Sequence, residues 1–403
     1  MNHERLRGWG PFGAGSFALL ALLIGSNLPT PLFPLYSKVY GLSSLVVTLL
    51  FATYALTVIP ALLIFGPLSD AKGRREVLTA AIIVAAVAAL LFAMATEVAV
   101  LFVAQVVQAI ALGALQGTAA PTLVEYDPSG QRRRASATAS ALTVAGAAFG
   151  PLLAGVLAQY APLPQRLTYL VEVALLVVAL VAVLAFLPRR RDPQPWRPRR
   201  PSVPSGIRRP FVVAGISTFV AWAVTGLFLS LIPSFVISEL HHDNLALAGA
   251  VVALMLGLAA VVQVTGRRIG SLSAQMVGLV VMIAGVAVLI AADLTMTLSA
   301  LLVAAALAGI GQGLAFMGSL GDVNQIAPEN RRGDVVASYY VVVYVGTALP
   351  AIGVGVVAQL ASLPTAIEIF SYAVVVICLA GLAGLVMEAQ SRRVRSDPAL
   401  DRG

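Results

Sequence analysis

Three carboxylates lie in or near long apolar runs of this chain, where an acidic side chain is costly and usually functional. Glu172 is the most deeply embedded, about two helical turns into the run 167–187, whereas Asp322 and Glu368 lie nearer the ends of theirs. A carboxyl group with apolar neighbours can bind and release a proton, so Glu172 is the candidate proton carrier. A purely structural role for Glu172 is the alternative. The pair His241 and His242 falls between apolar runs and is predicted to be solvated.

The other chemically active residue types do not form a pattern typical of catalysis. The single cysteine, Cys378, lies in an apolar run, so a disulfide framework is excluded. We find no metal-ligand cluster, phosphate-binding loop or nucleophile elbow, and the glycine spacings typical of dinucleotide sites fall inside apolar runs. We therefore expect no enzymatic activity, no metal and no cofactor. The apolar runs contain no Lys or Arg, which disfavours an anionic substrate.

The composition indicates that lipid surrounds these runs. Of the 403 residues, 59% are apolar and only 11% are charged, and the mean hydropathy is +0.92, whereas soluble domains carry about 25% charged residues. A membrane-spanning helix needs about 20 mostly apolar residues. Lipid offers backbone groups no partner, so each such run is predicted to be an α-helix, the first retained rather than cleaved. The twelve runs are 13–35, 45–66, 77–96, 98–122, 135–160, 167–187, 211–237, 245–266, 275–292, 297–323, 335–360 and 365–387.

The basic residues lie almost entirely on one side of the predicted spans. All but two of the 26 Lys and Arg residues, Lys38 and Arg166, fall in the termini and in every second loop. By the positive-inside rule this bias predicts a multi-pass protein of the bacterial cytoplasmic (inner) membrane with both termini in the cytoplasm. The bases then report topology and a contact with anionic lipids at the cytoplasmic face. We expect no nucleic-acid partner.

The chain also repeats itself at an offset of 200 residues. The segments 148–164 and 348–364 agree at 8 of 17 positions, and the same register pairs Gly113 with Gly313 and Arg132 with Arg332. This register predicts two parallel repeats related by an axis along the membrane normal. The expected organisation is a six-helix bundle in residues 1–187, a Pro/Arg-rich cytoplasmic linker in 188–210, a second six-helix bundle in 211–387 and a cytoplasmic tail in 388–403.

The segment "GPLSDAKGRREVL", Gly66 to Leu78, concentrates charge between the second and third runs. Its G-x-L-x-D-x-x-G-R-R pattern, with twelve spans in two parallel halves, resembles the loop signature of the major facilitator superfamily. The resemblance implies an all-α membrane protein of two six-helix repeats, and a conformational latch on the cytoplasmic side. The predicted latch comprises Gly66, Asp70, Gly73, Arg74, Arg75 and Glu125. The alternative is that the loop is merely a solvated turn and that Glu125 is an exposed carboxylate at a helix end.

The fifth run carries "GAAFGPLLAG", which resembles the antiporter motif of the superfamily's drug:proton antiporter branch with twelve spans. Ala154 departs from that motif, which has glycine there. Small residues one turn apart permit close helix packing, and a proline bends the helix. Generic small-residue packing is the alternative. The motif residues are Gly146, Gly150, Pro151 and Gly155.

Candidate cavity residues come from five runs. Prolines in "NLPTPLFPLY" free backbone carbonyls near Asn27 and Thr30. In the fourth run, "LFVAQVVQA" has Gln105 where proton-coupled members of the superfamily have arginine, and retains Gln108. The departure puts a simple transfer of that coupling mechanism in doubt. Trp222, Gln312 and Tyr340 complete the predicted cavity. Each of the seven could instead serve helix packing.

Together these features predict a secondary transporter that works by alternating access. The expected activity is proton-coupled efflux of hydrophobic or drug-like small molecules by a monomer. The substrate is expected to be lipophilic and neutral or weakly cationic, because the candidate cavity is rich in aromatic and amide groups. A facilitator or symporter for a small neutral metabolite is the alternative, which Gln105 favours. A transporter-derived receptor or scaffold is a third reading, which the intact latch motif disfavours.

Overall fold

The computed structural model describes residues 9–189, 195–196 and 200–396. The ends of the chain and linker residues 190–194 and 197–199, part of the predicted linker and tail, lie outside this description. Within it, twelve helical segments are long and apolar enough to cross a membrane, which confirms the predicted spans. The first half contains α1 (Trp9–Ser26), η2 (Thr30–Leu32), α2 (Phe33–Tyr40), α3 (Ser44–Lys72), α4 (Arg74–Ala93), α5 (Val98–Tyr126), α6 (Arg132–Tyr160) and α7 (Leu167–Phe186).

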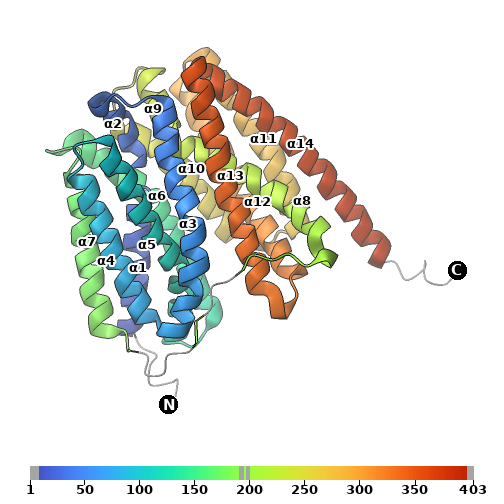
Figure 1. Ribbon diagram of the computed structural model, residues 1–403. Coiled ribbons are helices and arrows are strands. Elements are labelled where there is room, and N and C mark those ends of the chain that lie inside the picture. Colours follow the sequence, from blue (N-terminus) through green and yellow to red (C-terminus); the bar gives the residue numbers. More distant parts are fainter. Residues whose placement is uncertain (1–8, 190–194, 197–199, 397–403) are drawn as a thin grey trace.

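The second half repeats this order. It contains η3 (Ser205–Ile207), α8 (Arg208–Ser230), α9 (Ile232–Ser238), α10 (Leu245–Thr265), η4 (Gly266–Arg268), α11 (Ser271–Thr295), α12 (Leu298–Ile326), η5 (Glu329–Arg331), α13 (Arg332–Leu360) and α14 (Leu363–Ser396). The two halves form separate groups of helices that lie side by side (Figure 1). This arrangement is the predicted all-α fold of two parallel six-helix repeats.

The first span of each half is broken at the same level. In the first half, Pro29 and Pro31 end α1 and start the short η2 before α2 continues. In the second half, Leu231 separates α8 from α9, and Pro233 stands in the first turn of α9. Proline has no N–H to donate and fixes its own backbone angle, so the helix axis changes direction at these points. The sequence analysis predicted freed carbonyls at the prolines of the first span, but it predicted neither break.

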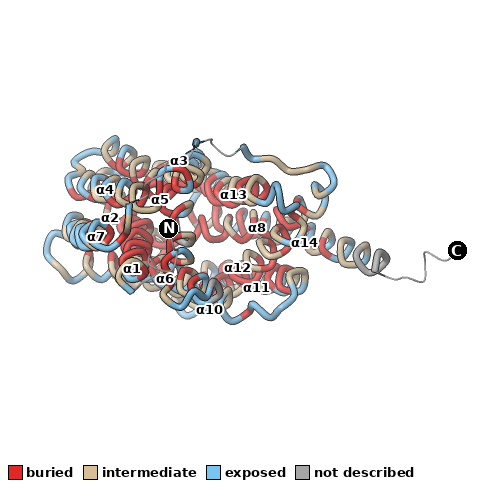
Figure 2. The backbone as a smooth tube through the Cα atoms, turned by 90° about the horizontal axis from the view of Figure 1, so that it is seen from below, coloured by how far each residue is buried: buried red, intermediate tan, exposed pale blue. Residues whose placement is uncertain are grey.

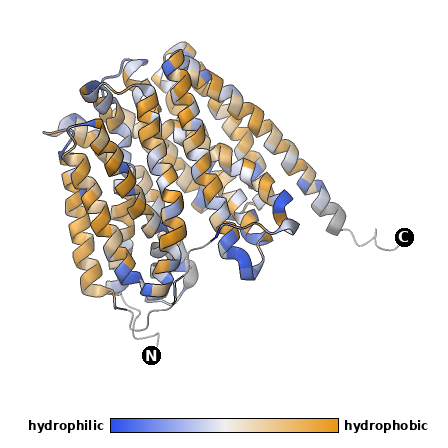
Figure 3. Cartoon of the chain, viewed as in Figure 1, coloured by the Kyte–Doolittle hydropathy of each residue, from blue (hydrophilic) through white to orange (hydrophobic). Residues whose placement is uncertain are grey.

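The surface and interior of the bundle differ in side-chain size. Large apolar side chains such as Val181, Leu294 and Val376 are exposed on the flanks of the bundle, where a membrane would cover them. Figure 3 shows hydrophobic residues over the helix flanks and hydrophilic ones gathered near the helix ends. The buried residues follow the inner sides of both helix groups (Figure 2), and many are alanine or glycine. Small residues let the helices approach closely without a hydrophobic driving force from water.

The most extensive packing between the halves is that of α3 against α13 and of α6 against α10. We name the two ends of the bundle after glycines. The Gly73 face is the end at which α3 meets α4, and the Gly41 face is the end at which α2 meets α3. At the Gly41 face, Lys38 forms an ion pair of 3.1 Å with Asp243, and the Gln159 side chain accepts a 2.8 Å hydrogen bond from the Leu245 N–H. The halves are therefore tied together at the Gly41 face.

Candidate functional site

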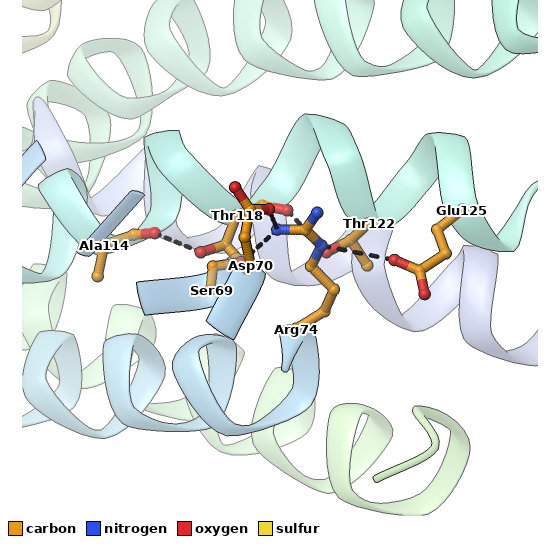
Figure 4. Close-up of polar contacts among 7 residues, drawn as sticks. All are labelled: Ser69, Asp70, Arg74, Ala114, Thr118, Thr122 and Glu125. Atoms are coloured by element: carbon orange, nitrogen blue, oxygen red, sulfur yellow. Dashed lines mark hydrogen bonds and ion pairs between the residues drawn. The ribbon is translucent and has the colours of Figure 1, made fainter. Parts of the chain in front are cut away.

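A charged cluster at the Gly73 face unites the central residues of the predicted latch. The Arg74 guanidinium donates to Asp70 at 2.7 Å and approaches Glu125 at 3.5 Å (Figure 4). Only 16% of the Arg74 side chain is exposed, against 54% for Asp70 and 40% for Glu125. One shielded cation thus holds two carboxylates that come from the ends of α3 and α5.

Local backbone geometry explains why Arg74 reaches both acids. Gly73 ends α3 with φ 116° and ψ 152°, a conformation that residues with a Cβ rarely adopt, and α4 begins at the next residue. The chain therefore reverses within one residue, and Arg74 turns back over the end of α3. The Ser69 hydroxyl accepts a further hydrogen bond of 2.6 Å from the guanidinium (Figure 4).

A close crossing of α3 and α5 supports the cluster. A Cβ added to Gly117 would collide with the backbone of Gly66, so the two helices touch at their backbones. On the neighbouring turns of α5, the Thr118 and Thr122 hydroxyls donate to the carbonyls of Ala114 and Thr118, each at 2.7 Å (Figure 4). Gly66 was a predicted site residue, whereas Gly117 was not. A glycine four residues after Gly113 in the fourth run was the available signal.

Arg75 does not join this cluster. Its guanidinium instead donates a 2.8 Å hydrogen bond to the carbonyl of Leu184 near the end of α7. A cation at a helix C-terminus satisfies a carbonyl that has no helical donor and interacts favourably with the helix dipole. The structure therefore divides the two arginines of the motif between separate tasks. Ion pairing belongs to Arg74, and anchoring of α7 belongs to Arg75.

The antiporter-type motif lies where α6 contacts two other helices. Gly146 and Gly150 face α1, because an added Cβ would meet Leu23 or the carbonyl of Ile24. Gly155 faces α10 in the other half, where an added Cβ would lie 2.5 Å from the Leu245 carbonyl oxygen. Pro151 also contributes to the second contact, since its carbonyl lies against Gly249. The motif therefore packs α6 both within its own half and across the boundary between halves.

The candidate proton carrier Glu172 is buried in α7, with 1% of its surface exposed. The Gln108 amide on α5 donates to its carboxylate at 3.4 Å, and Gly25 on α1 leaves room for that carboxylate. No described Lys, Arg or His forms an ion pair with Glu172. Of the other acids, Asp322 is buried in α12, and Glu368 accepts a hydrogen bond from Tyr372 at 3.0 Å. His241 and His242 are exposed near the Gly41 face.

The predicted cavity residues fall into two groups rather than one. In the first half, Asn27 donates to the Ala147 carbonyl at 3.5 Å, and Thr30, Gln105 and Gln108 are buried. The second group is an aromatic series in which the ring centres of Trp222 and Phe316 lie 5.4 Å apart. Phe316 stacks on Tyr339, and the ring centres of Tyr339 and Tyr340 lie 6.0 Å apart. Phe316 was not predicted. It follows Gln312 by four residues, one helical turn, and that spacing is the signal for it.

Unpaired polar atoms accompany both groups. The indole nitrogen of Trp222 and the side-chain oxygens of Gln312 and Gln108 are buried without a hydrogen-bond partner among the described residues. Buried polar atoms without partners are uncommon and call for an explanation such as a ligand or water.

A hydrogen bond between the two halves was not predicted. The Gln116 amide on α5 donates to the Tyr344 hydroxyl on α13 at 2.5 Å.

The architecture and the loop motif agree with a comparison against known families. Residues 15–351 match the model of the Major Facilitator Superfamily, which is most of the chain. The chain belongs to the major facilitator superfamily. It is therefore a membrane-spanning member of a transporter family, as the resemblance implied.

Individual relatives are distant. The chain is 24% identical over 224 residues to the quinolone resistance protein NorA of Staphylococcus aureus, which covers 55% of this chain and 54% of that protein. The chain thus spans about half the length of the curated relatives it matches. Among solved structures, a bacterial homologue of the human lysosomal transporter Spinster superimposes with a TM-score of 0.72 at 17% identity, covering 94% of this chain and 96% of that one. A mutant of the nucleoside transporter NupG gives 0.71 at 14%, covering 95% and 100%. Both likenesses concern the fold.

Proposed function

We propose that this protein exports lipophilic, neutral or weakly cationic small molecules in exchange for protons. The superfamily supplies the transport fold, and the relative named for quinolone resistance supports a drug-like cargo. The observation that carries the exchange is the environment of Glu172. Its carboxylate is buried and has no cationic partner among the described residues. A buried charge without an opposite charge is costly, and a proton removes that cost.

Contacts of Glu172 link it to helices that must move in alternating access. Gln108 holds the carboxylate from α5, and Gly25 on α1 borders it. The same α1 packs on the motif residues Gly146 and Gly150 of α6, and α6 meets the other half through Gly155. A change in the protonation of Glu172 would therefore alter packing that continues to the boundary between the halves. In this proposal Glu172 is the proton carrier and α6 transmits the change.

The aromatic series of the second half supports the proposed cargo class. Trp222 and Gln312 offer one donor and one acceptor without partners, beside the rings of Phe316 and Tyr339. Such a mixture suits a flat, largely apolar molecule with few polar groups. Asn27, Thr30, Gln105 and Gln108 are the candidate polar contacts from the first half.

The proposal also assigns a role to each face of the bundle. The basic loops support an orientation with the Gly73 face, both chain termini and the linker in the cytoplasm of a bacterial cell, where anionic lipids would be neighbours. The Asp70–Arg74–Glu125 cluster would then latch the cytoplasmic side, and the contacts of α6 with α10 would seal the outer side. We assign this activity to a monomer, with no cofactor and no nucleic-acid partner.

The test uses proteoliposomes loaded with a lipophilic dye and an imposed pH gradient. We expect the wild type to move dye against its gradient when protons flow the other way, and Glu172→Gln to lose at least about tenfold of that rate. The matched control is Glu97→Gln, which changes an exposed acid before α5 and should keep the wild-type rate. Dye movement that ignores the pH gradient in the wild type would refute proton exchange. Equal rates in wild type and Glu172→Gln would remove Glu172 as carrier.

A facilitator or symporter for a small neutral metabolite is the second candidate. The observation that favours it is Gln105, which stands where proton-coupled members have arginine and is buried with 4% exposure. The same vesicles separate the two candidates. A facilitator would equilibrate its cargo at a rate unaffected by pH, and a symporter would move cargo in the same direction as the protons.

A further inference from the structure

A groove of about 200 Å³ lies between α3 and α4, close to the Gly73 face. Both helices pack extensively on α5 but touch each other little, so they diverge from the turn that joins them and α5 forms the floor of the groove. Ala80 in its lining is exposed, and so is Ile83 one turn further along α4, which shows that the groove opens on a flank that a membrane would cover. Four small residues leave its space unfilled: Ala80, Ala81, Ala111 and Ala114.

The walls of the groove are apolar over about two helical turns. Phe65 and Leu68 line it from α3, and Val77 and Val84 line it from α4. The rise of α4 from Val77 to Val84 is about 10 Å. A cavity of about 150 Å³ already holds benzene, so the groove has room for a segment of one lipid acyl chain.

Two charged residues of the loop motif, Lys72 and Glu76, also line the groove. Lys72 is the last residue of α3, and Glu76 lies in the first turn of α4, so both belong to the end nearest the Gly73 face. Arg74 pairs with two acids and Arg75 binds α7, whereas neither Lys72 nor Glu76 forms an ion pair with any residue that the structure describes. The two charges that have no task in the latch thus meet at one end of an apolar groove.

The Glu76 side chain has an acceptor that the described residues leave unsatisfied. Its Oε2 atom is buried and has no hydrogen-bond partner among them. A buried acceptor without a donor is costly, and a donor on a bound molecule removes that cost. Lys72, in contrast, is exposed, and a cation at this level of a membrane protein meets lipid phosphates. The two side chains therefore complement a head group that carries an N–H donor and a phosphate.

We propose that this groove binds a phospholipid whose head group carries both a phosphate and a primary ammonium group. The ammonium donates to Glu76 Oε2, the phosphate pairs with Lys72, and one acyl chain lies between α3 and α4. A trimethylated ammonium carries the same charge but has no N–H to donate. An anionic head group without an amine supplies no cation to Glu76 and brings a like charge near it. The groove therefore selects lipids by the chemistry of their head groups.

Such a lipid would join the two sides of the turn at Gly73. Its head group bridges the last residue of α3 and the first turn of α4, and Arg74, which holds two acids, lies between these points. The lipid would thus brace, from outside the protein, the segment that positions the ionic cluster. Its binding requires neither a cargo nor a proton gradient, so it is independent of the proposed export.

The experiment titrates the purified full chain in detergent with three lipids of identical acyl chains, and native mass spectrometry separates bound from free protein. The probes are phosphatidylethanolamine with a primary ammonium, phosphatidylcholine with a trimethylated one, and the anionic phosphatidylglycerol. We expect the wild type to bind phosphatidylethanolamine at least about fivefold more tightly than either of the others. Equal binding of phosphatidylethanolamine and phosphatidylcholine would overturn the proposal. Tightest binding of phosphatidylglycerol would also overturn it, because only the charge of Lys72 would then act.

Glu76→Gln tests the contact with the ammonium group. We expect it to weaken phosphatidylethanolamine binding about fivefold and phosphatidylcholine binding less than about twofold. Glu97→Gln is the matched control, because it changes an exposed acid before α5 and should keep the wild-type preference. Lys72→Gln should weaken both zwitterionic lipids about threefold, since both carry the phosphate. A preference for phosphatidylethanolamine that persists in Glu76→Gln would overturn the assignment.

Ala80→Phe tests the acyl-chain position, because it fills the groove from an exposed site. We expect it to weaken phosphatidylethanolamine binding about fivefold or more. Val87→Phe is the matched control, since Val87 is exposed on the same helix and does not line the groove. Unchanged binding in Ala80→Phe would place the lipid elsewhere and overturn the proposal. Size-exclusion profiles and melting curves verify that each variant is folded, and the comparison of lipids on the wild type needs no variant.

The lipid experiment fails separately from the export proposal. Selective lipid binding by a protein that ignores the pH gradient would leave the groove assignment standing and refute proton exchange. Proton-driven dye export by a protein that binds the three lipids equally would do the reverse.

Discussion

In the first half of the bundle, Asp70 precedes the triplet Gly73-Arg74-Arg75 by three residues. In the second half, Gln263 precedes Gly266-Arg267-Arg268 with the same spacing. Both triplets follow the second span of their half, on the same face of the molecule. The acid on the fourth span differs in the same manner, because Glu125 corresponds to Gln325 at the repeat offset of 200. Each of the two carboxylates that contact Arg74 thus has an amide as its counterpart.

The structures of the two triplets differ accordingly. Arg74 is shielded between two acids, whereas Arg267 and Arg268 are exposed and form no ion pair with any residue that the structure describes. Gln325 instead donates to the Ser271 hydroxyl at 3.4 Å. Among the described residues, the ion pairs at the Gly73 face are those of Arg74 in the first half. The two halves thus share the bases at this position but not the acids.

Helix packing, in contrast, is alike in both halves. Gly113 on α5 lies against the backbone of Ala61 on α3, and Gly313 on α12 lies against the Ala259 carbonyl on α10. At each position an added Cβ would collide with the neighbouring helix. The two halves thus share their packing at the crossing of the second and fourth spans and differ in charge at the end of the second.

Gly113→Val and Gly313→Val are expected to have the largest effects. Each forces apart two helices in backbone contact, which costs about 1–3 kcal/mol or more. We expect the melting temperature in detergent to fall by about 1–4 °C or more for both, with reduced expression. Gly353→Val is the control, because an added Cβ there meets nothing within 4 Å, and it should keep the wild-type value. A tolerated Gly113→Val beside a damaging Gly313→Val would show that the two crossings are not equivalent.

The fold and the side-chain contacts of the site could not be predicted equally well from the sequence. The twelve spans could be predicted because lipid requires long apolar helices, and the fold followed from the loop motif and the repeat. The pairing of Asp70 with Arg74 could be predicted because the two residues are four positions apart, where α3 ends and α4 begins. The separate placement of Arg75 on α7 depends on a contact between residues 109 positions apart, which spacing along the chain does not encode. The same holds for the Gln116–Tyr344 hydrogen bond, which joins residues 228 positions apart.

Asp70→Asn is expected to have the next largest effect. It removes one of the two carboxylates on Arg74 and should lower transport about five- to tenfold, while membrane insertion stays normal. Dye export from proteoliposomes measures the rate, and protease accessibility of the loops verifies insertion. Arg75→Gln is the matched comparison, because it leaves the Asp70–Arg74–Glu125 cluster intact and should lower transport less. Equal losses in the two variants would mean that the cluster has no task of its own.

The smallest expected effect comes from giving the second half the acids of the first. The double change Gln263→Asp and Gln325→Glu offers Arg267 two carboxylates with the spacing that Arg74 has. Exposed ion pairs contribute about 0–1 kcal/mol, so we expect the melting temperature to rise by only about 1 °C, and the rise to vanish in 0.5 M salt. The same two changes in an Arg267→Gln background should give no rise, which isolates the pair energy. A rise that persists without Arg267 would show that the acids find another partner. Gln263 and Gln325 would then have a role other than leaving Arg267 without an ion pair.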